Sequence, residues 1–239
     1  MFVLGLDDSD FGRRVQFCRH LLHTDVDDGN FLKSILWTDE SKFDKEGIVN
    51  YHNLHHWSHK NQNPHVKRQR GFQRRFSVNV WAGVIGDKLI GPHYLPDNIN
   101  ANNYLDFLIN DLPPLMEEVF QVDINRPIVF QHDGCPAHFS LIVREHLDNC
   151  FPNSWIGRGG PIPWPPRSPD LTPLDFHVWG RAKELVYTTE VESREDLINR
   201  INAAFEVMRQ EMLLRTTTVE IRRRCRACIV NEGRQFEHL

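Results

Sequence analysis

Three aspartates stand where predicted elements end or begin, and carboxylates at such places suit metal-assisted chemistry. Asp39 lies in "WTDES", Asp133 in "QHDGCPAH" and Asp175 in "SPDLTPLD". Hard divalent cations such as Mg²⁺ bind carboxylate oxygens together with water and substrate phosphate. Two such ions a few ångströms apart can activate an attacking oxygen and stabilise a leaving one in phosphodiester chemistry. If the three side chains converge, they predict a site of that kind.

Each aspartate also has a structural interpretation, which the spacing alone leaves open. Asp39 can be a surface acid at a strand end, and Asp133 can form an Asx-turn with the glycine and cysteine after it. Asp175 can be the fourth position of a capping box that begins at Thr172. Acids at the ends of elements are common, so the choice depends on the elements around them.

Apolar runs place two of the aspartates at strand ends and the third at a helix start. Residues 34–41 and 126–133 each end an apolar run in acids, and ligands collect beyond strand ends in open α/β sheets. Residues 173–187 have a helical period with proline at the start, where proline is tolerated. Thr172 is a plausible N-cap, which places Asp175 in the first helical turn.

The remaining segments predict a mixed sheet covered by helices, which is the α/β class. Strands of the antiparallel type are expected at residues 34–41, 47–53 and 76–95. Helices are expected at residues 10–23, 99–120, 139–150, 193–213 and 220–230. Pro113 and Pro114 should kink or split the second of these helices. Residues 157–173, rich in glycine and proline, should form an irregular loop.

Composition indicates a folded protein. The chain has 239 residues, 40% of them hydrophobic, which is ample for a sizeable core. The net charge of -4 argues weakly against nucleic acid as a partner, but a total does not locate the charges. Five sparsely spaced cysteines favour a reducing compartment over a disulfide framework. No apolar stretch has the length of a signal peptide or a membrane span, so we expect a soluble intracellular protein.

Two groups of residues raise the question of zinc, and neither supports it well. "CRAC" (Cys225 to Cys228) is a single CxxC without a second pair, and a helix near the C-terminus explains it better. Five histidines occur between residues 52 and 65, but no cysteine or acid with ligand spacing completes a set.

"WTDES", "QHDGCPAH" and "SPDLTPLDFHVWG", taken in order, resemble the catalytic domain of mariner-type transposases of the DD(E/D) superfamily. The likeness runs from about residue 31 to residue 187. It implies a ribonuclease-H-like fold with Asp39, Asp133 and Asp175 as the catalytic ligands of Mg²⁺ or Mn²⁺. It also implies DNA as the partner, a possible homodimer, a nuclear location, and neither a membrane nor a small-molecule substrate. The divisions are then residues 1–30 as a helical extension, 31–190 as the catalytic domain, and 191–239 as helices packed on that domain.

The sequence departs from the family pattern at two places. Between Asp133 and Asp175 there are 41 residues, more than in common members, and the surplus lies in "FPNSWIGRGGPIPWPP". A glycine- and proline-rich loop can absorb such an insertion without moving the ligands. The second departure is "DGC" where the family usually has "DNA".

Basic residues with interleaved aromatics predict contact with DNA. "HVKRQRGFQRRF" offers positive charges for phosphates and aromatic faces for unpaired bases. A solvated loop is the alternative. The charged residues of this run that we assign to DNA are Lys67, Arg68, Arg70, Arg74 and Arg75. His138, five residues after Asp133, is expected to contact phosphate or to cap the next helix. "RRRCR" (222–226) is as consistent with a helix face as with DNA contact.

Only about thirty residues precede the first predicted strand, too few for the N-terminal helix-turn-helix region that full-length members carry. We therefore expect a transposase catalytic domain without that region, able to hydrolyse phosphodiesters at transposon ends and transfer strands. The alternative is a catalytically idle or host-adopted module that binds nucleic acid or protein.

Overall fold

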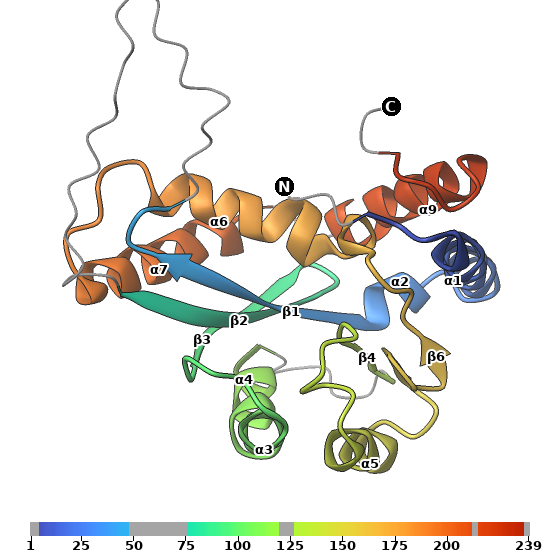
Figure 1. The fold of residues 1–239 in the computed structure, drawn as a ribbon, viewed down its shortest axis with the longest axis horizontal. Coiled ribbons are helices and arrows are strands. Elements are labelled where there is room, and N and C mark those ends of the chain that lie inside the picture. Colours follow the sequence, from blue (N-terminus) through green and yellow to red (C-terminus); the bar gives the residue numbers. More distant parts are fainter. Residues whose placement is uncertain (1–4, 48–75, 120–126, 212–214, 237–239) are drawn as a thin grey trace, which may run out of the picture.

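A computed structural model describes residues 5–47, 76–119, 127–211 and 215–236. Its centre is a mixed sheet of six strands in the order β3-β2-β1-β4-β5-β6 (Figure 1). The strands are β1 (Ile35–Asp44), β2 (Ser77–Ile85), β3 (Lys88–Leu95), β4 (Val129–Gln131), β5 (Trp155–Gly157) and β6 (Ile162–Pro163). Strands β1, β2 and β3 are antiparallel, whereas β4, β5 and β6 continue in parallel from β1. The predicted mixed α/β sheet is confirmed.

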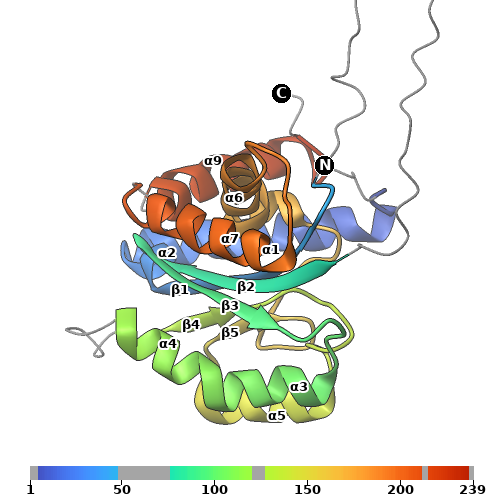
Figure 2. The ribbon, with the colours of Figure 1, turned by 90° about the vertical axis from the view of Figure 1, so that its left-hand side faces the viewer.

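Helices cover both faces of the sheet (Figure 2). One face carries α3 (Ala101–Asp106), α4 (Leu112–Val119) and α5 (Leu141–Cys150). The other carries α1 (Asp8–Asp27), α2 (Phe31–Ser34), α6 (Trp179–Val186), α7 (Arg194–Arg209) and α9 (Ile221–Val230). None of the helices in these described ranges is long and apolar enough to cross a membrane.

Strand β1 separates two apolar cores because its side chains alternate between the faces of the sheet. Trp37 is buried in the core beneath α6 and α7, and Leu36 is buried in the core beneath α3 and α5. Val129 of β4 lies on the Trp37 side. Continuing this alternation places Asp39 and Asp133 on that same side, the side of α6.

The larger core draws on the whole length of the chain. It contains Phe17 of α1, Trp179 of α6, Phe205 of α7 and Cys225 of α9, together with the side chains of β1 and β2 on that face. The N-terminal and C-terminal helices therefore share one apolar cluster with the sheet. The divisions at residues 30 and 190 stay predictions.

Three expectations about elements need correction. The segment 157–173 is not wholly irregular, because β5 ends in it and β6 adds a sixth strand to the sheet. The helix at residues 10–23 extends over Asp8–Asp27. Strand β1 continues three residues beyond 41. The expected strand at residues 47–53 lies, apart from residue 47, outside the described residues.

The helix that contains Pro113 and Pro114 is divided just ahead of them, in line with the prediction that they would kink or split it. A π-helical turn, Phe107–Asp111, joins α3 to α4, and the amide of Leu112 donates to the carbonyl of Phe107 five residues earlier. A proline inside a helix lacks an amide hydrogen and crowds the carbonyl four residues before it. The wider turn just ahead of Pro113 relieves that conflict, so the helical path continues.

Candidate metal centre

Asp39 lies in the middle of β1, five residues before the strand ends at Asp44, so the expectation that the strand ends at Asp39 is wrong. Other acids lie near its carboxylate. The indole Nε1 of Trp179 donates a hydrogen bond to Oδ2 of Asp39 at 2.7 Å, which orients the side chain towards α6. Burial raises the pKa of Asp39 well above its ordinary value, and nearby negative charges add to this effect. Those charges belong to Asp175, Glu40 and Asp133. The three aspartates singled out from the sequence therefore share one electrostatic environment.

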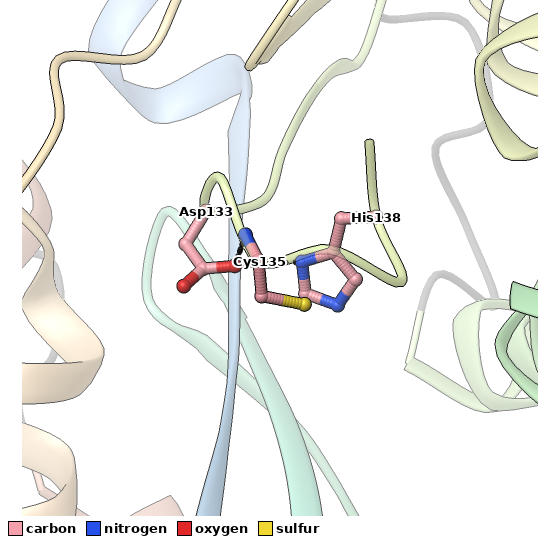
Figure 3. Close-up of side chains that lie close together, drawn as sticks. All are labelled: Asp133, Cys135 and His138. Atoms are coloured by element: carbon pink, nitrogen blue, oxygen red, sulfur yellow. Dashed lines mark hydrogen bonds and ion pairs between the residues drawn. The ribbon is translucent and has the colours of Figure 1, made fainter. Parts of the chain in front are cut away.

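Asp133 follows β4 and is held by its own loop (Figure 3). Its Oδ1 accepts a hydrogen bond from the amide of Cys135 at 3.0 Å and one from Nδ1 of His138 at 2.7 Å. The expected Asx-turn is thus present, but it occupies only one carboxylate oxygen. The side chain keeps 46% of its surface exposed. Asp133 can therefore be both a turn residue and a ligand.

The pKa of Asp133 moves in the opposite direction to that of Asp39. Burial alone would raise the pKa of Asp133, but the hydrogen bond and positive charge of His138, with the Cys135 amide, lower it below the ordinary value. The pKa of Asp133 is thus lowered while that of Asp39 is raised. Environments that shift the pKa values of neighbouring carboxyl groups in opposite directions are typical of functional sites.

Asp175 lies in the first turn of the helix that opens after "SPDLTP", as predicted. That turn, Leu174–Val178, is a π-turn, a form frequently found at functional sites. The hydroxyl of Thr172 accepts a long hydrogen bond of 3.4 Å from the amide of Leu174, so Thr172 acts as a weak cap. Lys183 lies in the helix that follows, α6. Burial lowers its pKa, and the negative charges of Asp175 and Asp39 partly oppose that shift.

His138 belongs to a buried group behind Asp133 rather than to the surface. The side chain is 1% exposed, and the expected contact with phosphate stays a prediction. Its Nε2 lies 3.4 Å from a carboxylate oxygen of Glu40, and its ring packs on Tyr104 at 4.1 Å. Burial lowers the pKa of His138, but Tyr104, Glu40 and the hydrogen bond to Asp133 outweigh this effect and raise the pKa well above 6.5. His138 thus lies between the carboxylates of Asp133 and Glu40, and its hydrogen bond to Oδ1 of Asp133 holds that side chain in place.

A second possible ligand group, which sequence reasoning missed, overlaps the first. Ligand atoms of Asp133, Cys135 and His138 all lie within 4.8 Å of one another (Figure 3). Thiol and imidazole ligands suit zinc, whereas hard cations such as Mg²⁺ prefer oxygen. Because Nδ1 of His138 is engaged by Asp133, the hydrogen-bonded arrangement already accounts for this cluster. The carboxylates remain the better match for a hard cation.

Asp170 has a structural role that separates it from Asp175. Both oxygens of Asp170 accept hydrogen bonds from the guanidinium of Arg14, at 2.8 and 2.5 Å. Arg14 is fully buried, and it also donates to Ser168 Oγ and to the carbonyl of Gly233. The first acid of "SPDLTPLD" thus fastens the loop to α1, which leaves Asp175 as the acid that faces Asp39.

The other residues singled out from the sequence fall into two groups. Residues 48–75 are not described, so the DNA contacts expected for Lys67, Arg68, Arg70, Arg74 and Arg75 lie outside the described residues. In α9, Arg222 forms an ion pair with Asp25 and Arg223 with Glu220, as expected of a helix face. The cysteines of "CRAC" are buried, and among described residues they belong to no group of three possible metal ligands.

The mixed six-stranded sheet, with Asp39 in its central strand β1 and Asp133 just after β4, is similar to the sheet of a transposase catalytic domain of known structure. The catalytic domain of Mos1 mariner transposase has this fold, with a TM-score of 0.72 and 20% identity over 99% of this chain and all of that domain. The Mos1 paired-end complex with Mg matches with a TM-score of 0.78 and 23% identity, over 99% of this chain and 66% of that one. No family model matches the sequence.

Two curated relatives connect the sequence to the same proteins. The chain is 27% identical over 204 residues to the transposase of the transposable element Tcb1 of Caenorhabditis briggsae. It is 27% identical over 206 residues to the Tc1 transposase of Caenorhabditis elegans. Each match covers 83% of this chain and 68% of the relative. The chain is homologous to the Tc1/mariner transposases, and its fold matches that of the Mos1 catalytic domain, which confirms the resemblance seen in the three motifs.

Proposed function

We propose that this catalytic domain cuts and joins DNA with the help of divalent metal ions. The reaction would be hydrolysis of a phosphodiester at a transposon end, followed by attack of the freed 3′-hydroxyl on target DNA. The observation that supports this most directly is the pKa of Asp39, raised by burial and by the charges of Asp175, Glu40 and Asp133. Carboxylates that repel one another in the folded protein favour binding a cation.

The donor set fits Mg²⁺ or Mn²⁺. Asp39, Asp133 and Asp175 offer only oxygen ligands, which such ions prefer, and structures of the Mos1 catalytic domain have been determined with Mg and with Mn. When bound, the ions would lower the pKa of the attacking water and stabilise the charge of the leaving oxygen. We assign the three aspartates as the ligands.

The surrounding residues prepare these ligands. Trp179 orients Asp39 through its indole hydrogen bond. His138 and the Cys135 amide hold Oδ1 of Asp133 and keep that carboxylate ionised, so Oδ2 can face a cation. Outer groups of this kind fix the ligands of metal sites and contribute substantially to their activity.

The partner proposed for the site is DNA. Several of the structural neighbours are Mos1 complexes with transposon ends, including a paired-end complex with the left end. By extension we propose a homodimer, a nuclear location, and the division into residues 1–30, 31–190 and 191–239. The matched relatives are longer than this chain, and each match covers 68% of the relative.

The proposal is tested by DNA nicking in the presence of Mg²⁺ or Mn²⁺. Asp39→Asn, Asp133→Asn and Asp175→Asn should each lower the rate more than about 100-fold, since even outer partners of metal ligands contribute 10–100-fold. Asp87→Asn is the matched control, because Asp87 is an exposed acid in the turn between β2 and β3. Nicking that survives Asp133→Asn would exclude this site. A folded protein that binds DNA and never nicks it would favour the idle, host-adopted alternative.

A further inference from the structure

Two arginines stack on one phenylalanine beside the candidate centre. The guanidinium carbons of Arg158 and Arg144 lie 4.2 and 4.7 Å from the centroid of the Phe139 ring. Phe139 belongs to the loop that carries Asp133, Arg144 to α5, and Arg158 to the turn after β5. Stacking on an aromatic face holds a guanidinium in place while its N–H edges stay available. These three residues form an arginine platform.

Sheet register brings the platform next to Asp133. In the parallel pair of β4 and β5, Gln131 pairs with Ile156, and the amide of His132 still donates to the carbonyl of Ile156. Two residues beyond Gln131 and Ile156 stand Asp133 and Arg158. Arg158 therefore follows β5 at the position that Asp133 occupies after β4.

Gly134 provides the space for the stem of Arg158. A Cβ atom at Gly134 would lie 3.4 Å from Cβ and 3.6 Å from Cδ of Arg158. A longer side chain at position 134 would compete with that stem. Gly134 and Arg158 lie in the two segments where the sequence departs from the family pattern, and these segments touch in the structure.

The charge of the platform is not neutralised by the described part of the chain. Neither Arg158 nor Arg144 forms an ion pair with a described carboxylate; Arg144 makes one hydrogen bond, from Nε to the carbonyl of Phe139 at 3.1 Å. Arginines elsewhere are paired with acids, among them Arg14, Arg167, Arg181, Arg200, Arg209 and Arg222. Arg158 is exposed and Arg144 is partly exposed.

We propose that the arginine platform of Arg158, Phe139 and Arg144 binds the phosphate backbone of the DNA strand that enters the site at Asp133. This rests on the proposed function and deepens it. A planar guanidinium with free N–H edges matches phosphate oxygens. Contacts of this kind position the strand and carry no sequence information. Placed beside Asp133, they would hold the backbone near the carboxylates.

The test measures binding of a duplex of arbitrary sequence in EDTA, over a series of salt concentrations. Each phosphate contact contributes about 0.9 to the slope of log affinity against log salt. Arg158→Ala should therefore reduce the slope by about 0.9, so that a fourfold rise in salt weakens the variant about 3.5-fold less than the unchanged protein. Arg158→Ala with Arg144→Ala should remove about 1.8. Arg158→Lys keeps the charge and should keep most of the slope.

The matched control is Arg194→Ala, which removes one exposed arginine on α7 in the helical layer that does not contain α5. Its slope should equal that of the unchanged protein. If Arg158→Ala keeps the full slope while nicking still depends on Asp133, the platform is wrong and the proposed function stands. A change in oligomeric state with an unchanged slope would assign Arg158 to a protein contact and also overturn the proposal. If the unchanged protein binds duplex DNA neither in EDTA nor with Mg²⁺, the proposed function itself fails.

Discussion

Asp39 of β1 and Asp133, which follows β4, stand at equal distances from the last residue pair of two neighbouring parallel strands. Trp37 of β1 pairs with Gln131 of β4, and each aspartate stands two residues further on. Thr38 fixes this register, because its hydroxyl donates to the carbonyl of Gln131 at 2.6 Å and its amide donates to the Gln131 side chain at 3.2 Å. The relative position of the two candidate ligands is thus set by Thr38, one residue before Asp39, and by Gln131, two residues before Asp133.

Thr38→Val should loosen this register while leaving the shape of the side chain nearly unchanged. Thr38 is buried, so the variant leaves the Gln131 carbonyl without its hydroxyl donor. Losing one buried hydrogen bond costs about 1–3 kcal/mol, and we expect a fall in melting temperature together with weaker metal-dependent nicking. Thr38→Ser keeps the hydroxyl and is the matched control. Equal nicking by Thr38→Val and Thr38→Ser would show that this hydrogen bond does not hold the site.

The pKa of Asp39 gives a pH dependence with a definite sign in the metal-free protein. Because the folded pKa is raised above 3.8, Asp39 contributes stability that is fully present below pH 3.8 and is lost as pH rises through the folded pKa. Asp39→Asn removes the charge and keeps an acceptor for Trp179. In EDTA near neutral pH, Asp39→Asn should therefore melt at a higher temperature than the unchanged protein.

Divalent metal should reverse that order. Binding to the folded state stabilises it, and Asp39→Asn removes a ligand. Thermal unfolding of both proteins, with EDTA and with millimolar Mg²⁺ or Mn²⁺, measures the two effects. An Asp39→Asn protein that is less stable than the unchanged protein in EDTA would contradict the repulsion inferred among the three aspartates.

His138 should support nicking because its hydrogen bond holds the carboxylate of Asp133 in place. Replacing it with alanine removes the donor to Oδ1 of Asp133, and we expect nicking to fall by about 10–100-fold, the range typical of groups that orient metal ligands. His138→Asn can place an amide donor near the position of Nδ1 and should retain more activity than His138→Ala. If the two variants lose activity equally, the hydrogen bond to Asp133 is not the reason for the histidine.

The same histidine predicts a second dependence on pH. Its folded pKa is raised above 6.5, so the stability it contributes is fully present below pH 6.5 and is lost as pH rises through the folded pKa. His138→Asn should lack this part of the alkaline loss. Melting temperatures from pH 6 upward, in EDTA, measure the difference between the two proteins, and parallel curves would contradict the positive charge assigned to His138.

The sequence carried the information for the three aspartates because each stands in a local pattern with a physical meaning. An apolar run followed by Asp39 or Asp133, and a proline-led helix start around Asp175, identify positions without any knowledge of distant contacts. The choice of Asp175 over Asp170 came from the resemblance to the family. The structure explains why Asp170 is not the ligand: its carboxylate is paired with Arg14, a residue 156 positions earlier in the chain.

What the sequence did not reveal depends on long-range packing. Strand β6 has two residues, too few for any periodicity. It forms because its backbone pairs with the edge of β5. The sequence alone suggests that His138 lies at the surface. In the structure it is buried by Tyr104 and Glu40, which come from two other elements. The platform of Arg158 and Phe139 likewise requires the pairing of β4 with β5, which no local pattern specifies.

Arg14 and Asp170 should behave as a buried ion pair that fastens the loop before Asp175 to α1. Arg14→Ala leaves the Asp170 carboxylate buried without its partner, and removing one member of such a pair costs about 3–5 kcal/mol. Arg13→Ala is the matched control, because Arg13 is the exposed neighbour on the same helix and surface changes usually stay within about 0.5 kcal/mol. Chemical denaturation of the two variants measures the difference.

A double variant separates the pair from its packing. Arg14→Met with Asp170→Leu replaces both charges by apolar groups, and such replacements are often neutral or stabilising where single removals are not. We expect the double variant to unfold at a higher denaturant concentration than Arg14→Ala. It should also nick DNA, since Asp170 is not assigned as a ligand, whereas Asp175→Asn should not. A stable double variant that has lost nicking would mean that Asp170 contributes to the site itself, and the assignment of Asp175 as the sole acid of that loop in the centre would be wrong.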